Sequence, residues 1–226
     1  MGKRGPKPKN TISTEWSANL AYAVGLLVTD GCLYNDGRHI SFTSKELEQI
    51  FNFKKCLSLV CVIGRTISGY DKGPSYRVQF GGIHFYNFLL SIGLIPAKSK
   101  TIGAIEIPDF YFFDFLRGCL DGDGSFYSYW DSRWRSSHMF YLEFTSASKE
   151  HLMWLQCKLF SLAGIKGHIT QSLKSRTYQL KYAKREGLEI IRKMYYSPGV
   201  VCLSRKREKI LNALMVEYKQ QLTYSR

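Results

Sequence analysis

The sequence is poor in acidic residues and has neither a long apolar run nor a closely spaced pair of cysteines. Its 226 residues include 18 Asp and Glu against 32 Lys and Arg. No segment approaches the roughly 18 consecutive apolar residues that a membrane span requires, and the N-terminal stretch MGKRGPKPKN lacks the apolar centre of a signal peptide. We therefore expect a protein that is not secreted and that works in a reducing compartment, either the cytoplasm of a bacterium or archaeon or an organelle.

The six cysteines show no CxxC spacing, which argues against a zinc site or a redox pair. Most of them stand among apolar neighbours, and free cysteine is among the residue types most often buried. We therefore predict core thiols at Cys32, Cys56, Cys61, Cys119, Cys157 and Cys202.

The excess of basic residues leaves a formal net charge of +14. An excess of this size indicates a polyanionic partner, with nucleic acid as the first candidate and an anionic membrane surface as the second. Hydrophobic residues make up 45% of the chain. That is enough for one large domain or for two fused subdomains of about 100 residues each.

The chain repeats itself at a spacing near 100 residues. Residues 26–31 (LLVTDG) recur in type as 119–124 (CLDGDG), an offset of 93, whereas residues 42–44 (FTS) recur as 144–146, an offset of 102. Residues 76–78 (YRV) recur in type as 178–180 (YQL), again with an offset of 102. The change of offset places a nine-residue insertion in one hairpin of the second half, where loops tolerate it. The pattern predicts a duplicated domain, that is, an internal pseudo-dimer.

Each half has the pattern of an αββαββα unit, which makes the fold class α+β. Thr14 or Ser13 is a plausible cap for a first helix over 16–29, and Asp109 for its copy over 110–122. Period-two alternation predicts strands around residues 40–44 and 140–144, and hairpins at 65–70 with 75–80 and at 166–173 with 176–182. The other predicted helices are 46–62, 83–92, 149–163, 185–195 and 204–220.

This reading divides the chain into five parts. They are a flexible basic N-terminal arm (1–13), a first repeat (14–94), a linker (95–108), a second repeat with the C-terminal helix (109–220) and a tail (221–226). The arm is too basic and too rich in Pro and Gly to fold alone. It could lie along the DNA backbone or minor groove, or be solvated without a specific role.

Residues 23–31 (AVGLLVTDG) and 116–124 (LRGCLDGDG) resemble the two nine-residue motifs of the LAGLIDADG homing endonucleases, in the monomeric form that carries both motifs in one chain. The second copy is close, and the first departs from the motif at several positions, including Val28 in place of an acid. The resemblance extends over nearly all of residues 14–220. It implies two pseudo-twofold-related repeats whose antiparallel sheets form a DNA-binding saddle, with the motif helices paired at the interface.

The spacing of residues within the two motifs also has a physical explanation that does not depend on the family resemblance. Gly25 and Thr29, like Gly118 and Gly122, are small residues four apart on one helix face, so the two helix backbones could approach closely. Such pairing would bring two aspartates together at the helix ends, where a hard divalent cation would neutralise them. The plainer interpretation is two helix-ending Asp-Gly turns with solvated carboxylates. The presence of the acid at the equivalent position of both halves favours a shared site.

The resemblance implies a site-specific, double-strand DNA endonuclease that cuts a long asymmetric target and leaves short 3′ overhangs. It assigns Asp30 and Asp123 as metal ligands, helped by the main-chain carbonyls of Thr29 and Gly122. The cofactor would be two or three Mg²⁺ ions, replaceable by Mn²⁺, with Ca²⁺ supporting binding without turnover. Lys98 matches the family's active-site lysine. Lys206 is the candidate partner in the second half, with Arg205 and Lys209 competing for that role.

A basic α/β chain with two four-stranded antiparallel sheets suggests that strands read DNA in the major groove. Strand alternation predicts the outward-facing side chains. They are Ser41, Thr66, Ser68, Tyr70, Ser75, Arg77 and Gln79 in the first half and Tyr141, Glu143, His168, Thr170, Ser172, Thr177, Gln179 and Lys181 in the second, with Tyr34, Arg38, Tyr127 and Tyr129 as neighbours.

Because the two faces differ in residue type, we expect an asymmetric target bound by a monomer. Two other functions stay open. One is an intron RNA maturase on the same scaffold, which would bind intron RNA. The other is a DNA-binding regulator that has lost catalysis, which the presence of both acids disfavours.

Overall fold

The computed structural model describes residues 12–67, 73–134, 137–172 and 176–224, and its two halves repeat the same succession of elements. The first half contains α1 (Ala18–Asp30), β1 (Gly31–Leu33), β2 (His39–Ser44), α2 (Leu47–Cys56), β3 (Gly64–Ile67), β4 (Pro74–Gly81) and α3 (Ile83–Ser91). The second contains α4 (Phe112–Asp121), β5 (Ser125–Trp130), β6 (His138–Ser146), α5 (Lys149–Ala163), β7 (His168–Gln171), β8 (Tyr178–Ala183) and α6 (Lys184–Met194), followed by α7 (Ser204–Tyr224). The predicted αββαββα order is confirmed.

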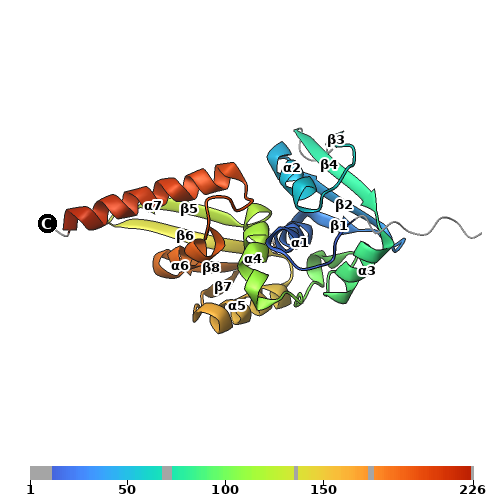
Figure 1. The fold of residues 1–226 in the computed structure, drawn as a ribbon. Helices are drawn as coiled ribbons and strands as arrows, with labels where there is room; N and C mark the ends of the chain where they lie inside the picture. The colour runs from blue at the N-terminus through green and yellow to red at the C-terminus, as the bar shows by residue number, and fades with distance from the viewer. Residues whose placement is uncertain (1–11, 68–72, 135–136, 173–175, 225–226) are drawn as a thin grey trace, which may run out of the picture.

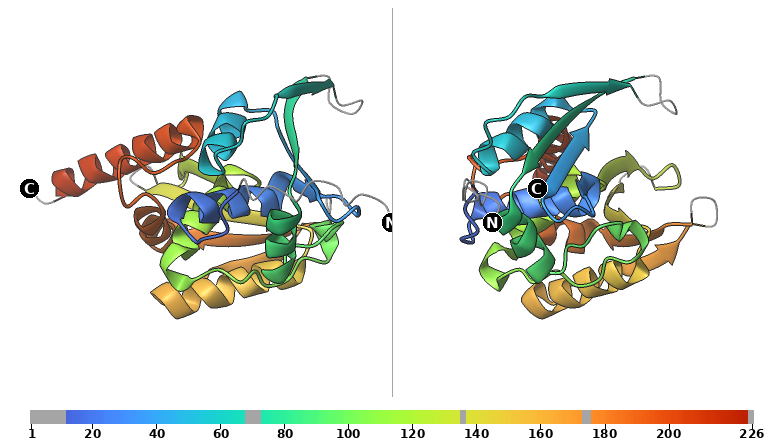
Figure 2. Two further views of the ribbon diagram at one scale, coloured as in Figure 1. Left: turned by 45° about the vertical axis from the view of Figure 1, so that its right-hand side comes forward. Right: turned by 90° about the vertical axis from the view of Figure 1, so that its right-hand side faces the viewer.

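Each half forms one antiparallel sheet of the same topology. The strand orders are β1-β2-β4-β3 and β5-β6-β8-β7. Helices α1 and α4 lie side by side at the centre of the molecule, and α2 and α5 lie on opposite sides of this pair (Figures 1 and 2). The arrangement places the ends of both motif helices next to the first strand of each sheet.

The nine-residue insertion lies where the sequence offset indicates. Strands β1 and β2 have 3 and 6 residues, whereas β5 and β6 have 6 and 9. The longer hairpin extends beside α7, well beyond the central helix pair (Figure 1). The second sheet is therefore the longer of the two along this direction.

Both predicted caps of the motif helices are wrong. Helix α1 begins at Ala18 because the Ser17 hydroxyl, not Thr14 or Ser13, accepts a hydrogen bond from the Leu20 amide (3.1 Å). Asp109 begins a 3₁₀ turn (Asp109–Tyr111) and α4 begins only at Phe112. The Asp109 carboxylate instead forms an ion pair with Lys158.

The second helix is shorter than predicted. It ends at Cys56 rather than near Val62, because Ser58 adopts a left-handed conformation (φ 51°) and the Leu59 amide donates to the Lys54 carbonyl (2.9 Å). This is the hydrogen bond of a Schellman-type helix end, in which glycine is the usual residue. Because a serine occupies that position instead of a glycine, the sequence did not indicate that α2 ends there.

The hydrophobic core is continuous across both halves. Phe42, Phe53 and Val78 are buried behind the first sheet, and Phe140 and Leu180 behind the second. The cysteine prediction is wrong in part. All six are free thiols, but only Cys119 and Cys202 are buried, whereas Cys32 and Cys157 are exposed. Within the described residues, none of the helices is long and apolar enough to cross a bilayer.

Candidate active site

The two motif helices pack backbone against backbone. A Cβ atom on Gly25 would lie 2.2 Å from the carbonyl oxygen of Phe115, and one on Gly118 would lie 2.2 Å from that of Tyr22. At the helix ends, a Cβ on Gly122 would lie 2.0 Å from the hydroxyl of Thr29. The close approach predicted from the small residues is confirmed, and it brings the two C-terminal helix ends together.

Two clefts flank these helix ends. The first, of about 380 Å³, is lined by Val28, Thr29, Lys98, Ser99, Ile102, Cys119, Asp123, Phe144, Thr145, Ser146, Ala147, His151, Leu152, Leu155 and Thr177. The second, of about 350 Å³, is lined by Asp30, Thr43, Ser44, Lys45, Glu46, Gln49, Ser75, Asp121, Gly122, Leu203, Arg205 and Lys206. Each cleft therefore combines the aspartate of one half with the lysine that follows the other half.

Eight lining positions of one cleft have a counterpart in the other. The repeat offsets pair Thr43 with Thr145, Ser44 with Ser146, Lys45 with Ala147, Gln49 with His151, Ser75 with Thr177, Val28 with Asp121, Thr29 with Gly122 and Asp30 with Asp123. An accidental surface hollow would not be duplicated in this way. The duplication indicates that the helix ends and the adjoining strand ends form two equivalent sites.

The two aspartates lie in surroundings that disfavour their charge. Burial, and then the charge of Asp123, raises the pKa of Asp30 to about 6. Burial also raises the pKa of Asp123, which is the more exposed of the two carboxylates. The charges of Lys98 and Lys206 act in the opposite direction on both aspartates. A cation bound between Asp30 and Asp123 would therefore stabilise their charged forms.

Each lysine reaches the carbonyl groups at the end of one motif helix. Lys98 Nζ donates to the Gly31 carbonyl (2.5 Å) and more weakly to that of Thr29 (3.5 Å). Lys206 Nζ lies within hydrogen-bonding distance (2.5–3.1 Å) of four carbonyls at the end of α4, and its three protons are shared among the oxygens of Leu120, Asp121, Gly122 and Gly124. Burial lowers the pKa of Lys98, and it lowers that of Lys206 to about 8.

The structure distinguishes among the three basic candidates after the second half. Lys206 lies where Lys98 lies in the first half, against the end of the motif helix. Arg205 also lines the second cleft, but its guanidinium pairs with Glu46 (2.9 Å), and Lys209 is exposed on the same helix. Lys206 is therefore the geometric counterpart of Lys98.

The strand registers place most of the predicted DNA-facing residues on one face of each sheet. In the first sheet Ser41 is paired with Gln79, and Thr43 with Arg77. Arg77 donates to Gln79 Oε1 (3.1 Å) and to the Tyr34 hydroxyl, and its guanidinium lies over the Tyr34 ring. These residues form one polar cluster on the strands next to α1.

In the second sheet the cross-strand rows are Tyr127–Tyr141, Glu143–Lys181–His168 and Thr145–Gln179–Thr170. The rings of Tyr127 and Tyr129 both stack on Tyr141, at 5.4 and 6.3 Å between centroids. Ser172 and Thr177 adjoin each other where β7 and β8 meet. This face is thus aromatic near the hairpin tip and polar near α4.

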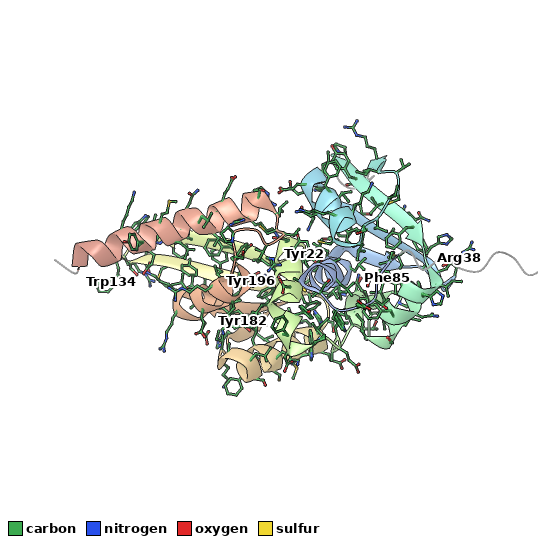
Figure 3. All side chains as sticks on the ribbon, viewed as in Figure 1. Tyr22, Arg38, Phe85, Trp134, Tyr182 and Tyr196 are labelled. Atoms are coloured by element: carbon green, nitrogen blue, oxygen red, sulfur yellow. The ribbon has the colours of Figure 1, made fainter. Side chains whose placement is uncertain are left out.

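Some predicted contacts are less open than expected or lie outside the described residues. Ser41 and Glu143, which are equivalent in the two halves, are buried, and Glu143 pairs with Lys181 (3.4 Å). Ser68 and Tyr70 lie outside the described residues, as does the side chain of Thr66 and nearly all of the basic arm. Arg38 and Trp134 belong to the tips of the two hairpins and lie at opposite ends of the molecule (Figure 3).

Solved structures match this fold, whereas no protein-family model and no curated protein matches the sequence. The LAGLIDADG homing endonuclease I-LtrWI bound to target DNA aligns over 89% of this chain and 91% of its own, with 12% identity and a TM-score of 0.60. For the meganuclease I-SmaMI bound to uncleavable DNA the shares are 89% and 92%, with 14% identity and a TM-score of 0.60. The chain has the LAGLIDADG fold.

The same fold occurs outside proteins named as endonucleases. The N-terminal LAGLIDADG domain of DUF199/WhiA aligns over 82% of this chain and 85% of its own, with 18% identity and a TM-score of 0.53. This chain spans 63% of the length of full-length DUF199/WhiA from Thermotoga maritima. At such identities the likeness establishes the fold.

Sequence reasoning missed several residues of the two clefts. Thr43 and Thr145 line the two clefts, and Gln49 and His151 stand behind them on α2 and α5. The recurring Phe-Thr-Ser segments, which established the repeat, already contained the threonines. Gln49 and His151 differ in type and gave no signal apart from their shared offset.

The pKa of Asp30 makes the stability of the folded chain depend on pH. A carboxyl with a pKa of about 6 when folded and near 3.8 when unfolded contributes stability that is fully present below about pH 4 and is lost as the pH rises through 6. We expect Asp30→Asn to raise the free energy of unfolding of the metal-free protein by up to about 3 kcal/mol near pH 8, and hardly at all near pH 4. Urea titrations at the two pH values measure this difference.

Asp36 is the matched control with the opposite sign. Hydrogen bonds from His39 lower the pKa of this exposed carboxyl to about 2, so Asp36→Asn should lower stability near neutral pH. An equal gain from Asp30→Asn at both pH values would contradict the electrostatic cause.

Proposed function

We propose that this chain is a site-specific double-strand DNA endonuclease that hydrolyses one phosphodiester of each strand with the help of divalent metal ions. The single observation that carries the proposal is the duplication of the cleft. Each copy has an aspartate, a lysine and a helix end in equivalent positions, contributed by both halves. Two equivalent sites in one chain match the two antiparallel strands of a duplex.

The donor set suits magnesium. Asp30 and Asp123 would supply carboxylate oxygens. Thr29 and Gly122 would supply main-chain carbonyls at the negative ends of two helices, beside the hydrogen bonds that these carbonyls accept from Lys98 and Lys206. Mg²⁺ in proteins is commonly held by one or two carboxylates, with water and substrate phosphates completing its shell. The raised pKa of Asp30 is a further reason to place cations there. When bound, such ions stabilise the attacking and leaving oxygens of the phosphodiester.

Lys98 and Lys206 would each act at one scissile phosphate. Each ammonium is held on the carbonyls of a helix end and lines the same cleft as an aspartate. From that position Lys98 and Lys206 can orient the attacking water and stabilise the charge that develops on the phosphate. The substrate itself would be held by the polar faces of the two sheets, which differ in residue type. The proposed target is therefore long and asymmetric, and the proposed active form is a monomer.

A cleavage selection tests this function. A randomised duplex library is incubated with the protein with and without Mg²⁺, and the cut molecules are sequenced. Enrichment of one long, asymmetric site, dependent on Mg²⁺, is the expected result. Selective retention of duplexes without cleavage would contradict the proposal and identify a DNA-binding protein that does not cut. Preference for structured RNA over any duplex would favour the maturase.

The polar cluster around Arg77 leads to a prediction about how the protein recognises DNA bases. Its guanidinium is held by Tyr34 and Gln79 on the proposed DNA-facing side of the first sheet. We expect Arg77→Ala to cost about 1–3 kcal/mol in binding and to relax base preference at one or two neighbouring positions. Binding titrations against single-base-pair variants of the selected target measure both effects. Lys158→Ala, on α5 behind the second sheet, is the control and should change neither.

A further inference from the structure

The two proposed lysines are held in place in different ways. Lys98 follows α3 after a segment of six residues (92–97), and it begins a 3₁₀ turn whose preceding residue, Ala97, has a φ of 52°. Lys206 follows α6 after a longer segment (195–203) and lies in the first turn of α7. A longer irregular segment has more conformations to lose, so its end needs additional contacts to be fixed.

Arg117 forms hydrogen bonds with both ends of the longer segment (195–203). This side chain is 1% exposed, although it carries a full charge. Its guanidinium donates to the Met194 carbonyl (2.5 Å) at the start of the segment and to the Val201 carbonyl (2.8 Å) near its end. It also pairs with Asp114 (2.6 Å) and lies over the rings of Tyr22 and Tyr196, which are labelled beside α4 in Figure 3.

Asp121 fixes the start of α7. Its buried carboxylate accepts a hydrogen bond from the Leu203 amide (2.7 Å) and another, on the same oxygen, from the Tyr22 hydroxyl (2.8 Å). The Leu203 carbonyl in turn accepts the Lys206 amide (3.0 Å), and Lys206 Nζ returns to the carbonyls that end α4. The network thus links α1, α4 and α7 and closes on the helix end that carries Asp123.

The first half has no counterpart of this network. The repeat offset pairs Tyr22 with Phe115, Asp114 with Ala21, Arg117 with Val24 and Asp121 with Val28. All four of these equivalents are buried and apolar. A buried polar network is costly unless each of its members is satisfied, and Asp121 Oδ1 is buried without a hydrogen-bond partner among the described residues. The apolar equivalents in the other half are compatible with the same helix pairing. The buried polar network must therefore meet a requirement that exists only in the second half.

We propose that Arg117 and Asp121 are positioning residues for Lys206, so that one of the two cleavage centres depends on a buried polar network which the other lacks. The inference rests on the proposed function, because it assumes that Lys206 acts on one strand and Lys98 on the other. Asp121 touches no substrate in this scheme. It sets where α7 begins, and so where the ammonium of Lys206 lies.

Strand-resolved cleavage tests the proposal. The selected duplex is labelled on each strand, and the nicking rates of Lys98→Met and Lys206→Met first assign one strand to each lysine. The double variant Tyr22→Phe/Asp121→Val copies the Phe115 and Val28 pair of the other half and leaves no orphaned hydroxyl. We expect it to slow the Lys206 strand by about 10- to 100-fold, because a misplaced group loses rate steeply with distance. The other strand and the affinity for uncut duplex should stay near their wild-type values.

Two further variants separate positioning from other roles. Asp121→Asn keeps an oxygen for the Leu203 amide and should restore most of the rate, whereas a loss as large as that of the valine variant would overturn the positioning role. Adding Asp121→Val to Lys206→Met should cause no further loss on that strand if Asp121 acts through Lys206. Should the double variant not fold, Arg117→Lys, which keeps a charge for Asp114 but loses the forked contact with the Met194 and Val201 carbonyls, gives the same test. A loss confined to the Lys206 strand supports the proposal, and equal relative rates on both strands overturn it. A wild-type protein that cuts neither strand contradicts the proposed function instead.

Discussion

Asp30→Asn and Asp123→Asn are each expected to abolish double-strand cleavage while leaving binding of the target largely intact. Each substitution removes one carboxylate ligand from the shared centre, and neither side chain belongs to the sheet faces proposed to read bases. Binding should even tighten slightly, because a negative charge near the phosphates is removed. Cleavage is measured on the selected duplex at saturating protein, and affinity by titration of the uncut duplex.

The control for this pair is Asp109→Asn. Asp109 is an exposed aspartate that pairs with Lys158 and lines neither cleft, so its loss should leave the cleavage rate unchanged. Full double-strand cleavage by either Asp30→Asn or Asp123→Asn would rule out a shared centre. Loss of binding together with cleavage would show instead that the aspartates support the fold rather than the chemistry.

The largest expected effect on stability comes from the glycines between the motif helices. Gly118→Ala places a methyl group where the Tyr22 carbonyl oxygen would be 2.2 Å away, and this neighbour is backbone that cannot swing aside. The helices must separate along their whole contact, so we expect a loss of about 3 kcal/mol or more in the free energy of unfolding, or no folded protein. Urea unfolding followed by circular dichroism measures the change.

Gly103→Ala is the matched substitution. Gly103 lies in the segment between the two halves, and a Cβ atom there would meet no heavy atom within 4 Å. Its replacement should change stability by no more than about 0.5 kcal/mol. A Gly118→Ala protein as stable as Gly103→Ala would contradict the close backbone packing of α1 and α4.

The repeat and the motif helices could be predicted because their signals are local or periodic. Phe42-Thr43-Ser44 and its copy fixed the offset, and strand alternation placed Arg77 and Gln79 on one face before their register was known. The small residues at 25 and 118 indicated a close helix contact because only small side chains permit one. The order of helices and strands in both halves followed from the same periodicity.

The rest depended on tertiary contacts that no local pattern records. The choice of Lys206 over Arg205 is decided by which side chain reaches the end of α4, more than 80 residues earlier in the chain. Asp121 stood in the motif as an acid of no assigned role, because its partners Tyr22 and Leu203 come from two distant segments. The end of α2 at Cys56, which depends on the positive φ of Ser58, was missed because serine rarely adopts such a conformation.

The central claim is that one chain holds two cutting centres related by an internal pseudo-twofold axis. The most direct test is to map the cut on each strand of a single target at one protein per duplex, with the stoichiometry established by analytical ultracentrifugation. The account predicts two Mg²⁺-dependent cuts, one on each strand and a few nucleotides apart, made by a monomer. A cut on one strand only, or cleavage that requires two protein molecules per duplex, would contradict it.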